Sequence, residues 1–95
     1  MVALIWTPRF TRAAKKFAQS HSELKIKFAG ILRDLERDPF QPHLKYHPLG
    51  GKLKGAQGVS LTESFRITLT VIISDKEIIL LDVGSHIPEK NQDLT

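Results

Sequence analysis

The sequence predicts an α+β fold in which a four-stranded antiparallel sheet packs against a helical hairpin. Apolar residues recur at helical spacing through residues 8–37 and alternate with polar ones through residues 65–74. Two further apolar runs, residues 2–6 and 77–83, complete the order β-α-α-β-β-β. With 95 residues, the chain is expected to be one domain spanning residues 1–95.

The first strand and first helix are predicted from adjoining segments. Residues 2–6 form a short β-prone run. Thr7 can then cap a helix, and Pro8 suits the first helical position. Residues 8–20 are predicted to form an amphipathic helix, with apolar positions at Phe10, Ala13, Ala14 and Phe17.

A second helix is predicted over residues 23–37, with Ser22 as its N-cap. Asp38-Pro39 should end it, because proline disfavours helix in the residue before it. The break between the two helices is about two residues long, so they should form an antiparallel hairpin. The apolar stripe of this second helix is spaced by three and four and comprises Leu24, Phe28, Ile31, Leu32 and Leu35.

The second half of the chain is predicted to be a β-meander. Proline and glycine punctuate residues 39–52, which therefore should form a loop. The tail at residues 88–95 is polar and is expected to be frayed. The three strands of the meander are expected at residues 52–62, 65–74 and 77–83.

Charge is divided unevenly along the chain, whose net charge is +4. Residues 1–54 carry eleven Lys and Arg against four Asp and Glu, whereas residues 55–95 carry three against six. A basic first half suits a polyanionic partner, either nucleic acid or an acidic protein segment. A solvated helix surface accounts for the same charges equally well.

Other compositional features exclude several kinds of site. The chain has no cysteine, which excludes disulfides, thiolate metal sites and cysteine nucleophiles. Its apolar runs are all shorter than the roughly 18 residues that a membrane span needs. The opening residues lack the basic region of a secretory signal, so the expected location is the cytoplasm.

Three short segments carry a resemblance to a known family. They are His47-Pro48-Leu49-Gly50-Gly51-Lys52-Leu53-Lys54-Gly55, Ser64-Phe65-Arg66-Ile67 and Ile79-Leu80-Leu81-Asp82-Val83-Gly84-Ser85-His86. In this order they resemble the loop-to-strand entry, the arginine-bearing strand and the final strand of the RelE/ParE toxin superfamily, in particular its YafQ-like branch. The resemblance covers about residues 3–87 and implies a RelE-like fold.

The resemblance implies a toxin of a type II toxin–antitoxin pair. Many members of the superfamily cut mRNA in the ribosomal A site without metal, by attack of a ribose 2′-hydroxyl on the adjacent phosphate. The ParE branch shares the fold but inhibits DNA gyrase. The implied partners are a cognate antitoxin, the ribosome and mRNA, with no cofactor, metal or membrane.

Metal-free RNA cleavage needs a base, an acid and a cation that stabilises the phosphate. His47 and His86 are the candidate base and acid, because imidazole titrates near neutral pH and both positions match site histidines of the YafQ-like pattern. Arg66 is the candidate cation, since it should point to the sheet face opposite Ile67. The alternative for each histidine is an ordinary surface loop residue. His21 and His43 match nothing and are expected to be structural.

Four further residues are candidates for RNA binding. Lys52 and Lys54 are two apart on a predicted strand and so share one face. The resemblance implies that they bind the RNA backbone, as the equivalent lysines do in RelE-like relatives, and the alternative is a solvated pair. Phe65 occupies the position of the family's site aromatic, although its phase also suits core packing. Ser64 stands just before it, where YafQ-like toxins have an aspartate.

The chain departs from the family pattern at Ser60, Ser64 and the C-terminus. Ser60 stands where YafQ-like toxins have a histidine, and no aromatic follows His86. These departures leave three hypotheses open. They are a ribosome-dependent mRNA endonuclease, a ParE-like gyrase inhibitor and a catalytically weakened relative that still binds antitoxin.

Overall fold

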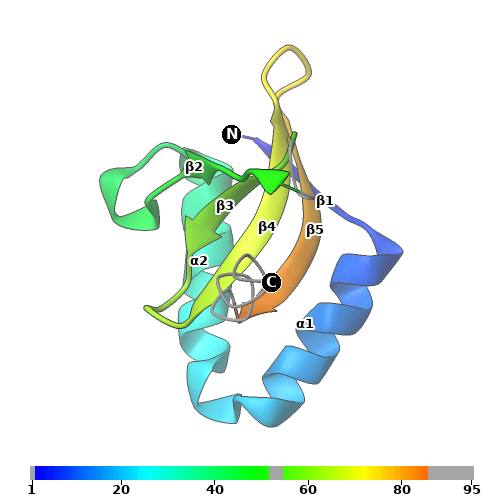
Figure 1. Cartoon of the computed structure of the whole chain (residues 1–95), viewed down its shortest axis with the longest axis vertical. Coiled ribbons are helices and arrows are strands. Elements are labelled where there is room, and N and C mark those ends of the chain that lie inside the picture. Colours follow the sequence, from blue (N-terminus) through cyan, green and yellow to red (C-terminus); the bar gives the residue numbers. More distant parts are fainter. Residues whose placement is uncertain (1, 52–54, 86–95) are drawn as a thin grey trace.

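The computed structural model describes residues 2–51 and 55–85 (Figure 1). The predicted tail at residues 88–95 and part of the predicted strand at residues 52–62 lie outside this description. The described elements are β1 (Ala3–Trp6), α1 (Pro8–Ser20), the 3-10 helix η1 (Ser22–Leu24), α2 (Lys25–Arg37), the 3-10 helix η2 (Pro42–Leu44), β2 (His47–Pro48), β3 (Gln57–Ser60), β4 (Phe65–Ile72) and β5 (Glu77–Ser85).

The strands form one mixed, five-stranded sheet in the order β1-β5-β4-β3-β2. The predicted meander of β3, β4 and β5 is antiparallel, but β1 pairs with β5 in parallel. The expectation of a four-stranded antiparallel sheet is therefore wrong in detail, whereas the α+β class is confirmed. Strand direction depends on a pairing between distant segments, which a short apolar run does not encode. The added strand, β2, has two residues and so cannot show a periodic pattern.

The two α-helices follow the predicted pattern, with one difference at their junction. The Oγ1 atom of Thr7 accepts a hydrogen bond from the Phe10 N–H, which caps α1 as predicted. Ser22 does not cap α2, because it begins η1, and α2 starts at Lys25 without a side-chain cap. The 3-10 helix η1 is wound more tightly than an α-helix, and it reverses the chain direction within a few residues. At Arg37 α2 ends, as the following Asp-Pro predicted.

Both helices cover the same face of the sheet (Figure 1). The Phe28 ring of α2 contacts two rings of α1. Its centroid lies 6.2 Å from that of Phe10 and 5.6 Å from that of Phe17. These rings pack with buried strand residues into one core. The strand residues of this core are Val59, Ile67, Leu69, Ile78, Leu80 and Val83.

A bulge between β4 and β5 sets which residues of β5 face the core. Thr68 pairs with Asp82, whereas the next residue, Leu69, pairs with Leu80. One extra residue in β5 changes the spacing of its buried positions from two to three. As a result Leu80 and Val83 both reach the core.

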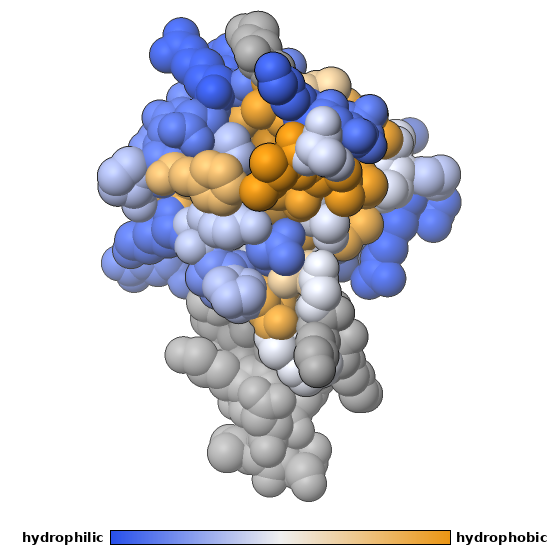
Figure 2. Space-filling model, turned by 90° about the horizontal axis from the view of Figure 1, so that it is seen from above, coloured by the Kyte–Doolittle hydropathy of each residue, from blue (hydrophilic) through white to orange (hydrophobic). Residues whose placement is uncertain are grey.

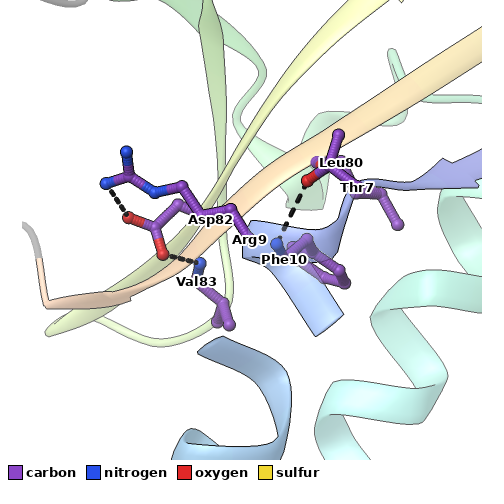
Figure 3. Close-up of polar contacts among 6 residues, drawn as sticks. All are labelled: Thr7, Arg9, Phe10, Leu80, Asp82 and Val83. Atoms are coloured by element: carbon purple, nitrogen blue, oxygen red, sulfur yellow. Dashed lines mark hydrogen bonds and ion pairs between the residues drawn. The ribbon is translucent and has the colours of Figure 1, made fainter. Parts of the chain in front are cut away.

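The junction between β1 and α1 is joined to β5 by a hydrogen bond and an ion pair (Figure 3). The Thr7 hydroxyl donates to the Leu80 carbonyl over 2.8 Å and accepts from the Phe10 N–H over 3.1 Å. Beside it, the Arg9 guanidinium and the Asp82 carboxylate form an ion pair of 3.1 Å. One threonine thus joins the first strand, the first helix and the last strand.

The end of the molecule that carries the β4–β5 hairpin has an apolar area on its surface (Figure 2). Ile73, which follows β4 at this hairpin, is 74% exposed, and Ile5, which pairs with Ile79, is 40% exposed. Arg66 lies near the opposite end of β4. Among residues 2–51 and 55–85, no helix is long and apolar enough to cross a bilayer.

Candidate functional site

A depression of about 370 Å³ lies where β2, β3 and β4 adjoin the turn between β3 and β4. Arg66 in its lining alternates along β4 with the buried Ile67, so the depression belongs to the sheet face opposite the helices. Its lining residues are Lys45, His47, Ser60, Thr62, Glu63 and Arg66.

Strand register brings two of the predicted site residues together. His47 pairs with Gly58 across β2 and β3, and Ser60 pairs with Arg66 across β3 and β4. A Cβ atom built on Gly58 would lie 3.4 Å from Cε1 of His47 and 3.5 Å from Cδ of Arg66. Both side chains therefore lie over the same glycine, whose missing side chain leaves them room.

The hydrogen bond of His47 defines which ring nitrogen carries the proton. Its Nδ1 lies 2.7 Å from the carbonyl oxygen of Lys45. Because a carbonyl oxygen only accepts hydrogen bonds, Nδ1 must donate, and the neutral ring then has its lone pair on Nε2. An exposed imidazole in this tautomer can take a proton from a bound hydroxyl group.

Positive charge gathers around the depression. Lys45 and Arg66 both line it, together with the carboxylate of Glu63. A guanidinium can hold a phosphate through two parallel hydrogen bonds, and an ammonium adds a point charge. The depression thus combines an imidazole whose Nε2 can accept a proton with two cationic side chains of the kind that bind phosphate.

Two further predicted site residues, Phe65 and Ser64, do not line this depression. Phe65 packs toward the helices, with its ring 5.2 Å from Phe17 and 4.6 Å from His21. Ser64 lies in the turn before β4, where its N–H donates to Oγ1 of Thr62. His86, Lys52 and Lys54 lie outside the described residues.

The sequence did not single out three residues of the lining: Lys45, Thr62 and Glu63. Ser60 was noted only as a departure from the family pattern. Lys45, Thr62 and Glu63 come from loops and turns, where no apolar period indicates which side chains converge. His21 and His43, expected to be structural, lie elsewhere, and Nε2 of His43 contacts the Asp34 carboxylate over 2.8 Å.

Solved structures with the same arrangement come from several bacteria. YafQ from E. coli BL21(DE3) matches with a TM-score of 0.75 at 18% identity, covering 94% of this chain and 98% of its own. The YoeB/ParE toxin from Agrobacterium tumefaciens matches with a TM-score of 0.73 at 21% identity, covering 90% and 99%. The chain has the RelE/ParE toxin fold. The resemblance predicted from the three sequence segments is thereby confirmed for the fold.

A third structure with the RelE/ParE toxin fold comes from a complex. A chain of the heterotetrameric YoeB–YefM toxin–antitoxin complex from Staphylococcus aureus matches with a TM-score of 0.68 at 20% identity, covering 90% of this chain and 98% of its own. No protein-family model and no curated protein sequence matches this chain. The described part of the chain contains no cluster of three or more metal-ligating side chains.

Proposed function

We propose that this protein is the toxin of a type II toxin–antitoxin pair and cuts mRNA on the ribosome. The observation that carries the proposal is the convergence of His47 and Arg66 over Gly58, in a depression that Lys45 also lines. A base and a cation at one surface are two of the three groups that metal-free RNA cleavage requires. The RelE/ParE fold of the chain supports the same reading.

In the proposed reaction, the ribose 2′-oxygen attacks the adjacent phosphorus while Nε2 of His47 takes the hydroxyl proton. The bond from phosphorus to the 5′-oxygen then breaks, leaving a 2′,3′-cyclic phosphate and a 5′-hydroxyl. Arg66 stabilises the extra negative charge on the phosphate in the transition state. His86 is proposed to donate the proton that the 5′-oxygen needs.

Ser60 and Ser64, which stand where YafQ-like toxins have a histidine and an aspartate, are proposed to have structural roles. The Ser60 hydroxyl donates to the Thr62 carbonyl over 3.2 Å, and so helps to close the turn beside the depression. Ser64 lies in that turn. A hydroxyl group does not titrate near neutral pH, so the proton transfers fall to His47 and His86. Lys52 and Lys54 are proposed to bind the RNA backbone.

Antitoxin binding is the second part of the proposal. The Staphylococcus aureus relative is part of a toxin–antitoxin complex, which supports a cognate antitoxin for this chain. An acidic partner is expected, because the first 54 residues carry a large excess of positive charge. Such a partner should raise the melting temperature of the protein.

Adding the protein to a translating extract tests the proposal, with mRNA ends mapped by primer extension. Codon-phased cuts are expected, and Arg66→Ala and His86→Ala should each reduce them by at least about 100-fold. Thr70→Ala is the matched control, because Thr70 shares the strand and face of Arg66 but does not line the depression.

A parallel DNA supercoiling assay distinguishes the ParE-like hypothesis. Intact mRNA together with lost supercoiling would identify a gyrase inhibitor and overturn the nuclease proposal. Intact mRNA with normal supercoiling would leave a catalytically weakened relative that binds antitoxin.

A further inference from the structure

Lys45 has a backbone conformation that lysine rarely adopts. Its φ and ψ angles are 52° and 44°, in the left-handed region, where it ends the short helix η2. Among residues 2–51 and 55–85, Lys76 is the other non-glycine residue with positive φ, at 54°. Side chains with a Cβ atom disfavour this region, and β-branched ones disfavour it most.

The left-handed turn is held at both ends. On one side, the Lys45 N–H donates to the Pro42 carbonyl over 3.1 Å. The helix η2 is itself tied to α2, because His43 contacts the Asp34 carboxylate and Gln41 donates to the Asp34 carbonyl, each over 2.8 Å. The position of the Lys45 carbonyl is thus set by the end of α2.

On the other side, Lys45 is hydrogen-bonded to His47, the candidate base. The Lys45 carbonyl accepts the Nδ1–H of His47 over 2.7 Å, two residues further along the chain. Rotating Lys45 into the extended region would turn this carbonyl away from the ring. Without this hydrogen bond, the ring would adopt mainly the Nε2–H tautomer, as free histidine does. In that tautomer Nε2 carries a proton and has no lone pair to accept another.

We propose that Lys45 is a positioning residue that acts through its left-handed backbone. Its carbonyl holds His47 as the Nδ1–H tautomer and so keeps Nε2 available as a proton acceptor. The consequence for cleavage rests on the proposed function, whereas the tautomer does not. The Lys45 side chain lines the depression, so the residue places a positive charge there as well.

Two substitutions separate the backbone role from the charge. Lys45→Asn and Lys45→Val both remove the charge, but asparagine tolerates the left-handed region and valine does not. Lys76→Val is the matched control, because it imposes the same substitution on the same backbone region. Lys76 lies at the β4–β5 hairpin, beyond the end of β4 that is farthest from Arg66 (Figure 1).

A long-range proton–nitrogen NMR spectrum at mildly alkaline pH reads the tautomer directly. His47 should be predominantly Nδ1–H in the wild type, Lys45→Asn and Lys76→Val, and should shift toward Nε2–H in Lys45→Val. The His47→Ala spectrum assigns the signals. If Lys45→Val does not fold, Lys45→Ala gives the same comparison with a smaller shift.

Cleavage in the translating extract is the second readout. Lys45→Val should cut about tenfold more slowly than Lys45→Asn, because only valine moves the carbonyl. An unchanged Nδ1–H signal in Lys45→Val would overturn the proposal, as would an equal tautomer shift in Lys76→Val. If the wild type does not cleave mRNA while the NMR result holds, the proposed function fails and the positioning role stands.

Discussion

Gly58 is the residue over which His47 and Arg66 meet. A methyl group there would lie 3.3 Å from Cδ2 of Leu49, 3.4 Å from His47 and 3.5 Å from Arg66. Leu49 would have to yield by a few tenths of an ångström, and the two site side chains would lose the space between them. The backbone of Gly58 does not require glycine, so its role is to leave that space.

Gly58→Ala should therefore fold and yet cleave RNA about 10- to 100-fold more slowly, since small displacements of reacting groups are costly. Gly84→Ala is the matched control, because Gly84 pairs with Arg66 in β5 but a Cβ atom there would have no neighbour within 4 Å among residues 2–51 and 55–85. Equal cleavage by both variants, measured by primer extension, would show that the space over Gly58 does not matter.

Tyr46 lies between Lys45 and His47, and its ring contacts Phe40 with centroids 4.9 Å apart. Partial burial raises the pKa of the Tyr46 phenol above its ordinary value of 10.0. The folded state therefore holds this proton more tightly than the unfolded state. Tyr46 contributes stability that is complete below pH of about 10 and is lost as pH rises through the raised pKa.

This shift can be measured without interference, because Tyr46 is the chain's single tyrosine. The phenolate absorbance should have its titration midpoint at a higher pH in the native protein than in concentrated urea. Tyr46→Phe should remove this contribution to the loss of stability above pH of about 10. Identical midpoints in the two solvents would contradict the account of Tyr46.

At the scale of elements, Thr7 connects β1, α1 and β5 (Figure 3). Thr7→Ala removes the cap of α1 and the bond to the Leu80 carbonyl, and should lower the free energy of unfolding by about 1–2 kcal/mol. Thr7→Ser should retain most of that stability. Denaturant unfolding followed by the fluorescence of Trp6, the chain's single tryptophan, measures both variants.

Arg9→Ala is the control for this junction. The ion pair of Arg9 with Asp82 is exposed, at 74% and 40% of the two side chains, so its loss should cost less than about 1 kcal/mol. A loss from Arg9→Ala as large as that from Thr7→Ala would mean that the ion pair, and not the cap, fastens α1 to the sheet.

The elements differ in how far the sequence predicts them. The alternation at residues 65–74 and the spacing from Phe10 to Leu35 follow from local periods, and both gave the correct elements. The parallel pairing of β1 with β5 joins residues 74 positions apart, which no local period records. For the candidate site, the resemblance indicated His47 and Arg66, whereas the role proposed for Lys45 depends on a backbone angle that its residue type does not indicate.

At the scale of the whole molecule, the candidate site should bind RNA through the phosphates of its backbone. The affinity for a short single-stranded RNA should fall linearly with the logarithm of salt concentration. Arg66→Gln should reduce the slope of that line by about 0.7, the change expected for one lost phosphate contact. Fluorescence anisotropy of a labelled RNA measures the slope.

Lys76→Gln is the control for net charge. It removes the same single charge at the hairpin, away from the depression. Its slope should equal that of the wild type. If the two variants change the slope equally, RNA responds to the overall charge of the protein and does not contact Arg66.

The central claim is that His47 and Arg66 act on one scissile phosphate, and a double-mutant cycle of cleavage rates tests it most directly. His47→Ala and Arg66→Ala should each slow cleavage by at least about 100-fold. Because both groups serve the same step, the double variant should be little slower than the slower single variant. Losses that multiply in the double variant, or a single variant that cuts at the wild-type rate, would contradict the claim.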